Sequence, residues 1–216
     1  MRPARGSSLS CMPLVTAHFT VSLDGFMAGP TQTLEEPLGV GGEDLHRWMF
    51  DEAAHPADVT VKERILAPRG AYIMGRNMFG PVRGPWEDAG DHADWRGWWG
   101  DEPPYHAPVF VLTHHPRDSV EMAGGTTFHF VGSFDEALSR AVEAADGDTV
   151  TIAGGASAVR QGLEAGVVDE FLVSHSPRAL GAGESPFHGL AGLEAEAVEV
   201  LSSPFATHVV YRVNKS

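Results

Sequence analysis

Two adjacent glycines, Gly154 and Gly155, form the strongest candidate for a chemical site in this chain. They follow β-forming residues at 149–152 and precede a helical pattern that begins at Ala156 and can end at Gly166. A helix that begins directly after two glycines presents unpaired backbone N–H groups and the positive end of its dipole, which favours phosphate binding. A Gly-Gly turn also joins strands to helices for steric reasons alone, so this motif leaves both interpretations open.

Two other expected strands end in residues that suit a phosphorylated ligand. Glycine lets the backbone approach a ligand closely, and a guanidinium can bind phosphate through two parallel hydrogen bonds. The residues are Gly75, Arg76 and Asn77 after the strand 71–74, and Thr113, His114 and Arg117 after the strand 109–113. Ligands of open α/β sheets bind beyond the carboxyl ends of the strands, so we expect these groups to lie near the Gly-Gly turn. Arg76 could instead pair with one of the many acidic residues, and the histidines could belong to a solvated turn.

The elements that must position these groups alternate between strands and helices, which predicts a layered α/β fold with a largely parallel sheet. The expected strands cover 14–23, 71–74, 109–113, 127–131, 149–152, 168–174, 194–201 and 207–213. The expected helices cover 44–52, 57–66, 133–145 and 156–166. Asp44 can cap the first of these helices, and Ser133 with Glu136 forms a capping box for the third. The closing strand pair indicates an antiparallel edge.

Residues 81–108 form a long connection that contains four of the chain's tryptophans, Trp86, Trp95, Trp98 and Trp99. A connection this long inside a compact fold is usually functional or disordered, and so many tryptophans argue against disorder. The segment is either a satellite core or a wall or lid for a flat ligand, and the sequence leaves both open.

Composition narrows the classes of function. The chain has 216 residues and a net charge of −14, which argues against nucleic-acid binding but permits an anionic cofactor, because local arginines outweigh a screened net charge. No apolar run approaches the roughly 20 residues of a membrane span. The single cysteine, Cys11, excludes an internal disulfide and indicates a cytoplasmic protein, and we expect no metal site. We interpret residues 1–12 as a disordered tail and 13–216 as one domain.

The motifs together resemble the dihydrofolate-reductase-like superfamily, in the branch of the reductase domain of riboflavin biosynthesis (RibD C-terminal). The matching segments are S-L-D-G-F-M-A-G-P, M-G-R-N-M-F, P-V-F-V-L-T-H-H-P-R, T-I-A-G-G-A and G-V-V-D-E-F-L-V-S-H-S-P-R-A-L-G-A-G-E-S-P-F, which span about 14–213 in the family's order. The resemblance implies a three-layer α/β/α fold with a mixed, mostly parallel sheet and an antiparallel C-terminal edge. It also implies a homodimer.

The resemblance further implies a reductase that uses NADPH to deliver hydride to a small heterocyclic or carbonyl substrate, as 5-amino-6-(5-phosphoribosylamino)uracil reductase or dihydrofolate reductase does. It places Gly75, Arg76 and Asn77 around the cofactor phosphates, and Thr113, His114 and Arg117 at the adenosine ribose and its 2′-phosphate. It places Gly154, Gly155, Ala156 and Ser157 at the pyrophosphate, and Met27, Ala28 and Gly29 along the nicotinamide. The alternative is a non-catalytic protein that binds NADP(H) on the same fold.

Two carboxylates are candidates for protonating the reduced substrate. Asp24 lies in the S-L-D-G motif and is the preferred candidate, although it could be a plain Asp-Gly turn. Asp51 lies on the first expected helix, three residues after Trp48, where it could also be a solvated helix residue.

The chain departs from the family pattern in several places. Met78 stands where the family often has threonine, which removes one hydroxyl contact to phosphate unless Asn77 replaces it. The chain also lacks the Leu-Pro-Trp segment and the glutamate-binding arginine of the folate reductases, so we expect no folate substrate. The zinc deaminase half of the bifunctional riboflavin enzyme needs more than one cysteine for its ligands, so with one cysteine we expect it to be absent as well.

Overall fold

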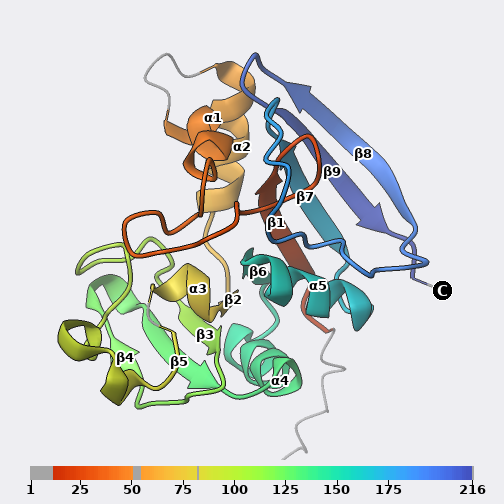
Figure 1. Cartoon of the computed structure of the whole chain (residues 1–216). Coiled ribbons are helices and arrows are strands. Elements are labelled where there is room, and N and C mark those ends of the chain that lie inside the picture. Colours follow the sequence, from red (N-terminus) through yellow and green to blue (C-terminus); the bar gives the residue numbers. More distant parts are fainter. Residues whose placement is uncertain (1–11, 51–54, 82, 216) are drawn as a thin grey trace, which may run out of the picture.

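A twisted, nine-stranded mixed sheet runs through the part of the chain that the structure describes (Figure 1). The structure is a computed structural model, and it describes residues 12–50, 55–81 and 83–215. The strands are β1 (Val15–Val21), β2 (Ala71–Gly75), β3 (Pro108–Leu112), β4 (Val120–Glu121), β5 (Thr127–Val131), β6 (Val150–Gly154), β7 (Glu170–His175), β8 (Ala195–Ser202) and β9 (Thr207–Val213). Their order is β4-β5-β3-β2-β6-β1-β7-β9-β8. Neighbours from β5 to β7 pair in parallel, whereas β4, β9 and β8 pair antiparallel, which confirms the predicted sheet.

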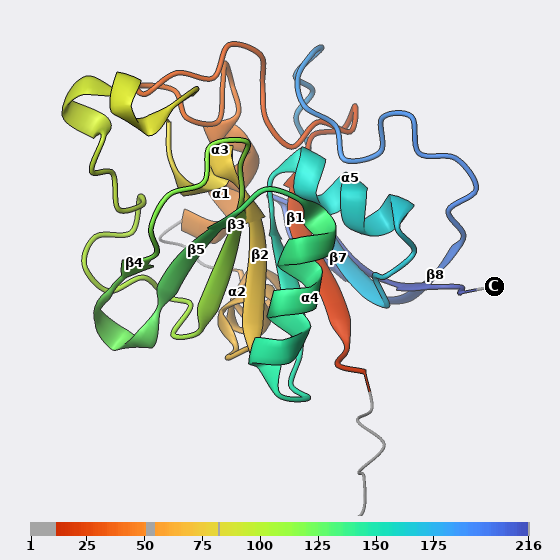
Figure 2. The ribbon, with the colours of Figure 1, turned by 90° about the horizontal axis from the view of Figure 1, so that it is seen from below.

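Helices cover both faces of this sheet. They are α1 (Arg47–Phe50), α2 (Pro56–Leu66), α3 (Arg76–Phe79), α4 (Phe134–Ala145) and α5 (Ala156–Glu164), with short 3-10 helices at Glu43–His46, Trp86–Asp88, Gly90–His92 and Ala123–Gly125. Figure 2 shows α4 and α5 on one side of the sheet and α1 and α2 on the other, which is the predicted α/β/α layering. None of the described helices is long and apolar enough to cross a membrane.

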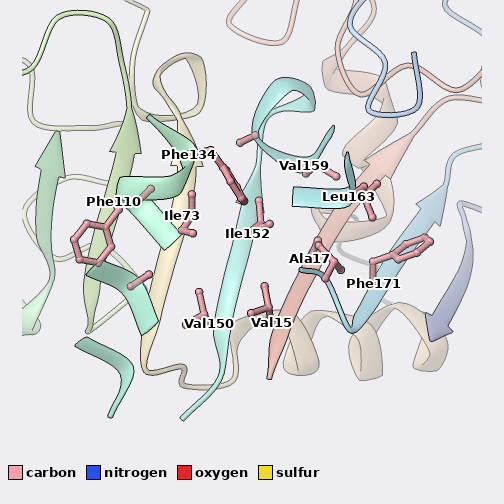
Figure 3. Packing of buried hydrophobic residues seen from close by; sticks show 14 of the residues in the cluster. Val15, Ala17, Ile73, Phe110, Phe134, Val150, Ile152, Val159, Leu163 and Phe171 are labelled. Atoms are coloured by element: carbon pink, nitrogen blue, oxygen red, sulfur yellow. The ribbon is translucent and has the colours of Figure 1, made fainter. Parts of the chain in front are cut away.

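The main hydrophobic core lies between the sheet and helices α4 and α5 (Figure 3). Ile152 of β6 contacts this core from the sheet, and Val159 and Leu163 of α5 contact it from above. All three side chains are buried, and each such side chain contributes about 1.5–3 kcal/mol relative to an exposed one. The packing therefore fixes α5 against β6 and holds the Gly-Gly turn between them.

Two smaller clusters cover the opposite face of the sheet. One joins α1 and α2 to β7 and β9 through Trp48, Val61 and Leu172. The other places the tryptophan-rich segment over β3 and β5, with Trp86 and Phe128 among its buried members. The strands between the two clusters form the floor of a large cleft.

Several boundaries differ from the sequence-based expectation for identifiable reasons. Ser133 caps α4 as predicted, accepting a hydrogen bond from the Glu136 backbone N–H at 3.2 Å. Asp44 does not cap the first helix, because its carboxylate pairs with Arg178 at 3.0 Å and the segment begins as a 3-10 helix. Strand β4 has two residues, too few to show a periodic pattern. Residues 1–11 of the predicted tail lie outside the described residues.

Candidate active site

A cleft of about 880 Å³ opens at the carboxyl ends of β2, β3 and β6 and continues over the sheet toward α1 and α2. It gathers most of the residues that the sequence singled out. Its lining includes Met27, Ala28, Gly75, Arg76, Asn77, Thr113, His114, Gly154, Gly155, Ala156 and Ser157. Gly29, Asp24 and Arg117 do not line it, and Asp51 lies outside the described residues. The sheet therefore brings the ends of three strands together, as the rule for open α/β sheets predicts.

The Gly-Gly turn leaves open space at the start of α5. Gly154 has a φ of +131°, and a Cβ there would lie 2.9 Å from the Met78 sulfur, so only glycine fits. Gly155 is the N-cap residue of α5 and has no side chain to cap the helix, and a Cβ at this position would meet no protein atom within 4 Å. The first backbone N–H groups of α5 thus face an open part of the cleft, which suits an anion.

Arg76 lies beside this turn and forms no ion pair with an acid among the described residues, although the chain contains 29 acidic residues. Its Nη1 donates a hydrogen bond to the Thr113 hydroxyl at 3.1 Å, and its guanidinium carbon lies 3.6 Å from the centre of the Trp86 ring. Its Nε and Nη2 atoms are buried and have no hydrogen-bond partner among the described residues. Burial, and then repulsion from Arg117, lowers the pKa of Arg76 from its usual value. Two covered donor atoms without a partner among the described residues, on a partly buried cation, suit an anionic ligand once a shift of the side chain uncovers them.

Arg117 has different partners. Its guanidinium donates hydrogen bonds to the backbone carbonyls of Ala93 and Trp95 and lies 3.9 Å from the centre of the Trp86 ring. Burial lowers the pKa of Arg117 from its usual value. These contacts fasten the tryptophan-rich segment to the loop after β3. The role of Arg117 at a 2′-phosphate stays a prediction, and the side chain would have to exchange these partners to fulfil it.

Asp24 holds two loops together outside the cleft. Its carboxylate accepts hydrogen bonds from the Ser22 hydroxyl at 2.6 Å and from the backbone N–H groups of Leu180 and Gly181 at 3.0 and 2.6 Å. The Ser22 hydroxyl and these backbone donors lower the pKa of Asp24 to about 2. The carboxylate is therefore ionised at neutral pH, and its role as the proton donor stays a prediction that would require these hydrogen bonds to be exchanged. The observed geometry makes Asp24 an anchor for the loop that pairs with Ala28 through Glu184.

The part of the cleft over the sheet contains side chains that the sequence did not single out. His18 and Thr20 of β1 and Tyr72 of β2 line its floor, because alternate residues of these strands face away from the main core. Burial, and then Arg69, lowers the pKa of His18 to about 4, so its imidazole is neutral at neutral pH. Burial also raises the pKa of Tyr72. The sequence contained a signal for these residues: polar side chains alternate with apolar ones along the strand.

The tryptophan-rich segment combines both of its predicted roles. Trp86 is buried in the cluster over β3 and β5 and donates a hydrogen bond to the His115 carbonyl at 2.7 Å. Trp98 and Trp99 line the cleft. One part of the segment is thus a satellite core, and another part is a wall of the cleft.

A buried Ser-His-Asp network lies beneath Trp48, on the side of the cleft formed by α1 and α2, with each link within hydrogen-bonding distance. His208 Nδ1 lies 2.8 Å from the Ser174 hydroxyl, and His208 Nε2 lies 2.8 Å from Asp58 Oδ1. All three side chains are buried, so no substrate can reach the serine, and the network is not a nucleophilic triad. Instead, it fixes α2 to β9 beneath Trp48, whose ring centre lies 4.8 Å from that of His208. Among the described residues, no group of three or more potential ligands is placed to hold a metal ion.

Comparisons with known proteins agree with this architecture. The model of the RibD C-terminal domain family matches residues 13–205. The chain is similar to a solved structure from Shewanella sp. PV-4, a protein assigned to riboflavin biosynthesis, with 18% identity and a TM-score of 0.61 over 94% of this chain and 99% of that chain. It is also similar to dihydrofolate reductase from Enterococcus faecalis complexed with NADP(H), with 16% identity and a TM-score of 0.55 over 94% and 98% of the two chains.

A third similar structure belongs to a longer protein. It is the diaminohydroxyphosphoribosylaminopyrimidine deaminase/5-amino-6-(5-phosphoribosylamino)uracil reductase of Thermotoga maritima, with 16% identity and a TM-score of 0.54. The match covers 94% of this chain but 57% of that chain. A comparison with curated proteins finds no match. At these identities the solved structures establish the fold, which is the dihydrofolate-reductase-like fold that the motifs predicted.

Proposed function

The chain belongs to the RibD C-terminal domain family, and from this premise we propose that it is an NADPH-dependent oxidoreductase that reduces a small heterocyclic or carbonyl substrate. The single observation that carries the proposal is the pairing of two anion-binding features in one cleft. One is the uncapped start of α5 at Gly155, and the other is the pair of unpartnered donors on Arg76. A dinucleotide with a 2′-phosphate needs separate positions for its pyrophosphate and for that phosphate.

In this proposal the backbone N–H groups of Gly155, Ala156 and Ser157 bind the pyrophosphate at the α5 N-terminus. Arg76 donates to a phosphate through Nε and Nη2, while Thr113 holds its Nη1 in place. Gly75 lets the ligand approach the backbone, with Asn77 and His114 at the rim. The fit rests on the buried, unpaired atoms of Arg76 and on the open space at Gly155.

Met27 and Ala28 border the nicotinamide in the proposal, whereas Gly29 follows them without lining the cleft, and the chain positions this segment through its backbone. The Met27 N–H donates to the Glu184 carbonyl at 2.8 Å, and the Glu184 N–H donates to the Ala28 carbonyl at 3.0 Å. Bound NADPH would supply the hydride, and the protein would supply position, charge and the exclusion of water. The aromatic walls beside this segment perform the last of these tasks.

A non-catalytic NADP(H)-binding protein is the second candidate. The observation that favours it is the position of Asp24, whose ionised carboxylate lies outside the cleft and is occupied by loop contacts. Oxidation of NADPH in the presence of a panel of heterocycles and carbonyl compounds separates the two candidates, because only the enzyme shows turnover.

The test of the nucleotide site is a matched pair of substitutions, Gly155→Asp and Gly155→Asn. Either side chain can cap α5 and enters open space, so we expect the melting temperature to be retained in both. The aspartate adds a negative charge where the pyrophosphate would lie. We expect NADPH to bind Gly155→Asp at least about tenfold more weakly than Gly155→Asn, measured by calorimetry. Equal affinity of the wild type and Gly155→Asp would remove the proposed site.

A further inference from the structure

The cleft has two ends with opposite chemistry. The end at the strand termini contains Arg76 and the open start of α5. The other end, which we call the aromatic compartment, lies over β1 and β2 and is enclosed by Trp48 and Leu66 on one side and by Tyr105 on the other. The difference between the two ends limits what each can bind.

Three charged side chains line the described part of the cleft: Arg76, Arg83 and Glu184. Arg83 donates to Gln32 next to Asn77, and Glu184 pairs with Ala28, so we assign all three to the end away from Trp48, Leu66 and Tyr105. The walls of the aromatic compartment also take Met49 and Ile65 from α1 and α2 and Pro104 from the tryptophan-rich segment. Arg69 acts on His18 and Tyr72 by charge but donates its hydrogen bonds to the carbonyls of Arg64 and Pro68. It does not line the cleft, so it offers no direct partner to an anionic substrate group.

Polar groups are nevertheless present on the floor of the compartment. The imidazole of His18 and the hydroxyl of Tyr72 form no hydrogen bond with another described residue, and both line the cleft. Low pKa for His18 and raised pKa for Tyr72 keep both groups uncharged at neutral pH. Each can donate or accept a hydrogen bond with a neutral ring nitrogen, amide or carbonyl.

We propose that the substrate is a neutral, planar heteroaromatic or conjugated carbonyl compound that carries no phosphate or carboxylate group. The proposal rests on the proposed function, because it assigns the arginine end of the cleft to the nucleotide. A phosphate or carboxylate buried in the aromatic compartment would lose its hydration and find no cation among the described residues. Flat, uncharged rings instead gain contact with the faces and edges of Trp48, Tyr72 and Tyr105.

The same argument separates this chain from one of the proteins it resembles. The name of the Thermotoga maritima enzyme describes a substrate with a phosphoribosyl group. The aromatic compartment of this chain has no charged side chain among its described residues to hold such a group. The common fold would thus serve a different class of substrate here.

Two pairs of compounds test the proposal. Each pair shares one ring system and differs in charge: 6-methylpterin with pterin-6-carboxylate, and 2-acetylnaphthalene with 2-naphthoate. Affinities are measured by calorimetry, with and without saturating NADP⁺. We expect the neutral member of each pair to bind at least about tenfold more tightly, because the anion loses its hydration without gaining a partner. Tighter binding of the anionic members, or binding of none of the four compounds, overturns the proposal.

A substitution that adds a positive charge beside the aromatic compartment tests where the compounds bind. Leu66 is 51% exposed on α2 and lines the cleft, whereas Val59 is 37% exposed on the same helix and does not line it. We expect Leu66→Arg to tighten binding of pterin-6-carboxylate at least about tenfold and Val59→Arg to leave it unchanged. An unchanged affinity in Leu66→Arg would show that the ring lies elsewhere.

Titration with NADPH alone keeps the two proposals distinguishable. If NADPH binds and the anionic compounds are preferred, the substrate class is wrong and the nucleotide site stands. If NADPH fails to bind while the neutral compounds bind beside Leu66, the nucleotide proposal is wrong and the assignment of the aromatic compartment stands.

Discussion

Replacing Arg76 with methionine should weaken NADPH binding by about thirtyfold to a hundredfold. Methionine keeps much of the length of the side chain and its contact with Trp86 but removes the charge and all the N–H donors. In the wild type, Nη1 is held by Thr113, whereas Nε and Nη2 are buried without a partner. Each charge-assisted hydrogen bond that these two atoms form with a phosphate contributes about 1.5–3 kcal/mol. At the lower end of this range, two such bonds give about 3 kcal/mol. Repulsion from Arg117, which lowers the pKa of Arg76, offsets part of this gain, and the remaining roughly 2–2.7 kcal/mol corresponds to about thirtyfold to a hundredfold.

The assay is calorimetric titration of the wild type and Arg76→Met with NADPH and NADH, which closes a thermodynamic cycle. A loss confined to NADPH identifies the 2′-phosphate as the partner of Arg76, and an equal loss for both nucleotides identifies the pyrophosphate. Arg96→Met is the matched control, because Arg96 is an exposed arginine that does not line the cleft. Unchanged affinity for both nucleotides in Arg76→Met would refute the reasoning, since the free donors would then have no phosphate to meet.

Three further predictions concern groups around the cleft. Asp58→Ala should lower the free energy of unfolding by about 3 kcal/mol, because it leaves the buried His208 without its 2.8 Å partner; urea denaturation measures this, and a loss near zero would contradict the argument. Lowering the pH from about 6.5 to 4 should cost up to roughly 3 kcal/mol of stability through His18, since the unfolded chain takes up a proton that the folded protein resists until about pH 4. His18→Asn should flatten that part of the stability profile, and an unaltered slope would count against it. Asp24→Asn should weaken NADPH binding a few-fold by loosening the loop at Leu180 while leaving turnover at saturation largely unchanged; a selective loss of turnover would support Asp24 as the proton donor.

The sequence predicted the sheet and the grouping of Gly75, Arg76 and the Gly-Gly turn at one end of the cleft, because both depend on local signals. Glycine after a strand, a helix start and an arginine at a strand end are all visible in a few consecutive residues. The Gly-Gly turn at 154–155 and the group at 75–77 lie in the cleft for this reason. The parallel pairing of their strands then brings distant parts of the chain to one edge.

The aromatic compartment and the role of Asp24 depend on long-range contacts, which a linear pattern does not contain. Asp24 looks like an Asp-Gly turn, and only the fold shows that Leu180 and Gly181 donate to its carboxylate. His18 lies in a strand whose sequence is typical of a buried core strand. It faces the cleft because the two hydrophobic clusters on that face of the sheet leave a gap between them. The proximity of Arg76 and Arg117 around Trp86 likewise joins residues far apart in the chain.

The charge distribution gives the two proposals a common physical basis. In a chain with a net charge of −14, a partly buried arginine would be expected to attract a carboxylate, yet the ion pairs of the described residues do not include Arg76. Holding Arg76 near Arg117 without an acid costs free energy, which an anionic ligand offsets when it binds. The aromatic compartment has the reverse requirement, because the described side chains around Trp48, Leu66 and Tyr105 carry no charge that needs a partner. Two ligands of different charge would therefore be sorted to opposite ends of one cleft, the anionic nucleotide to the arginine end and the neutral ring to the aromatic end.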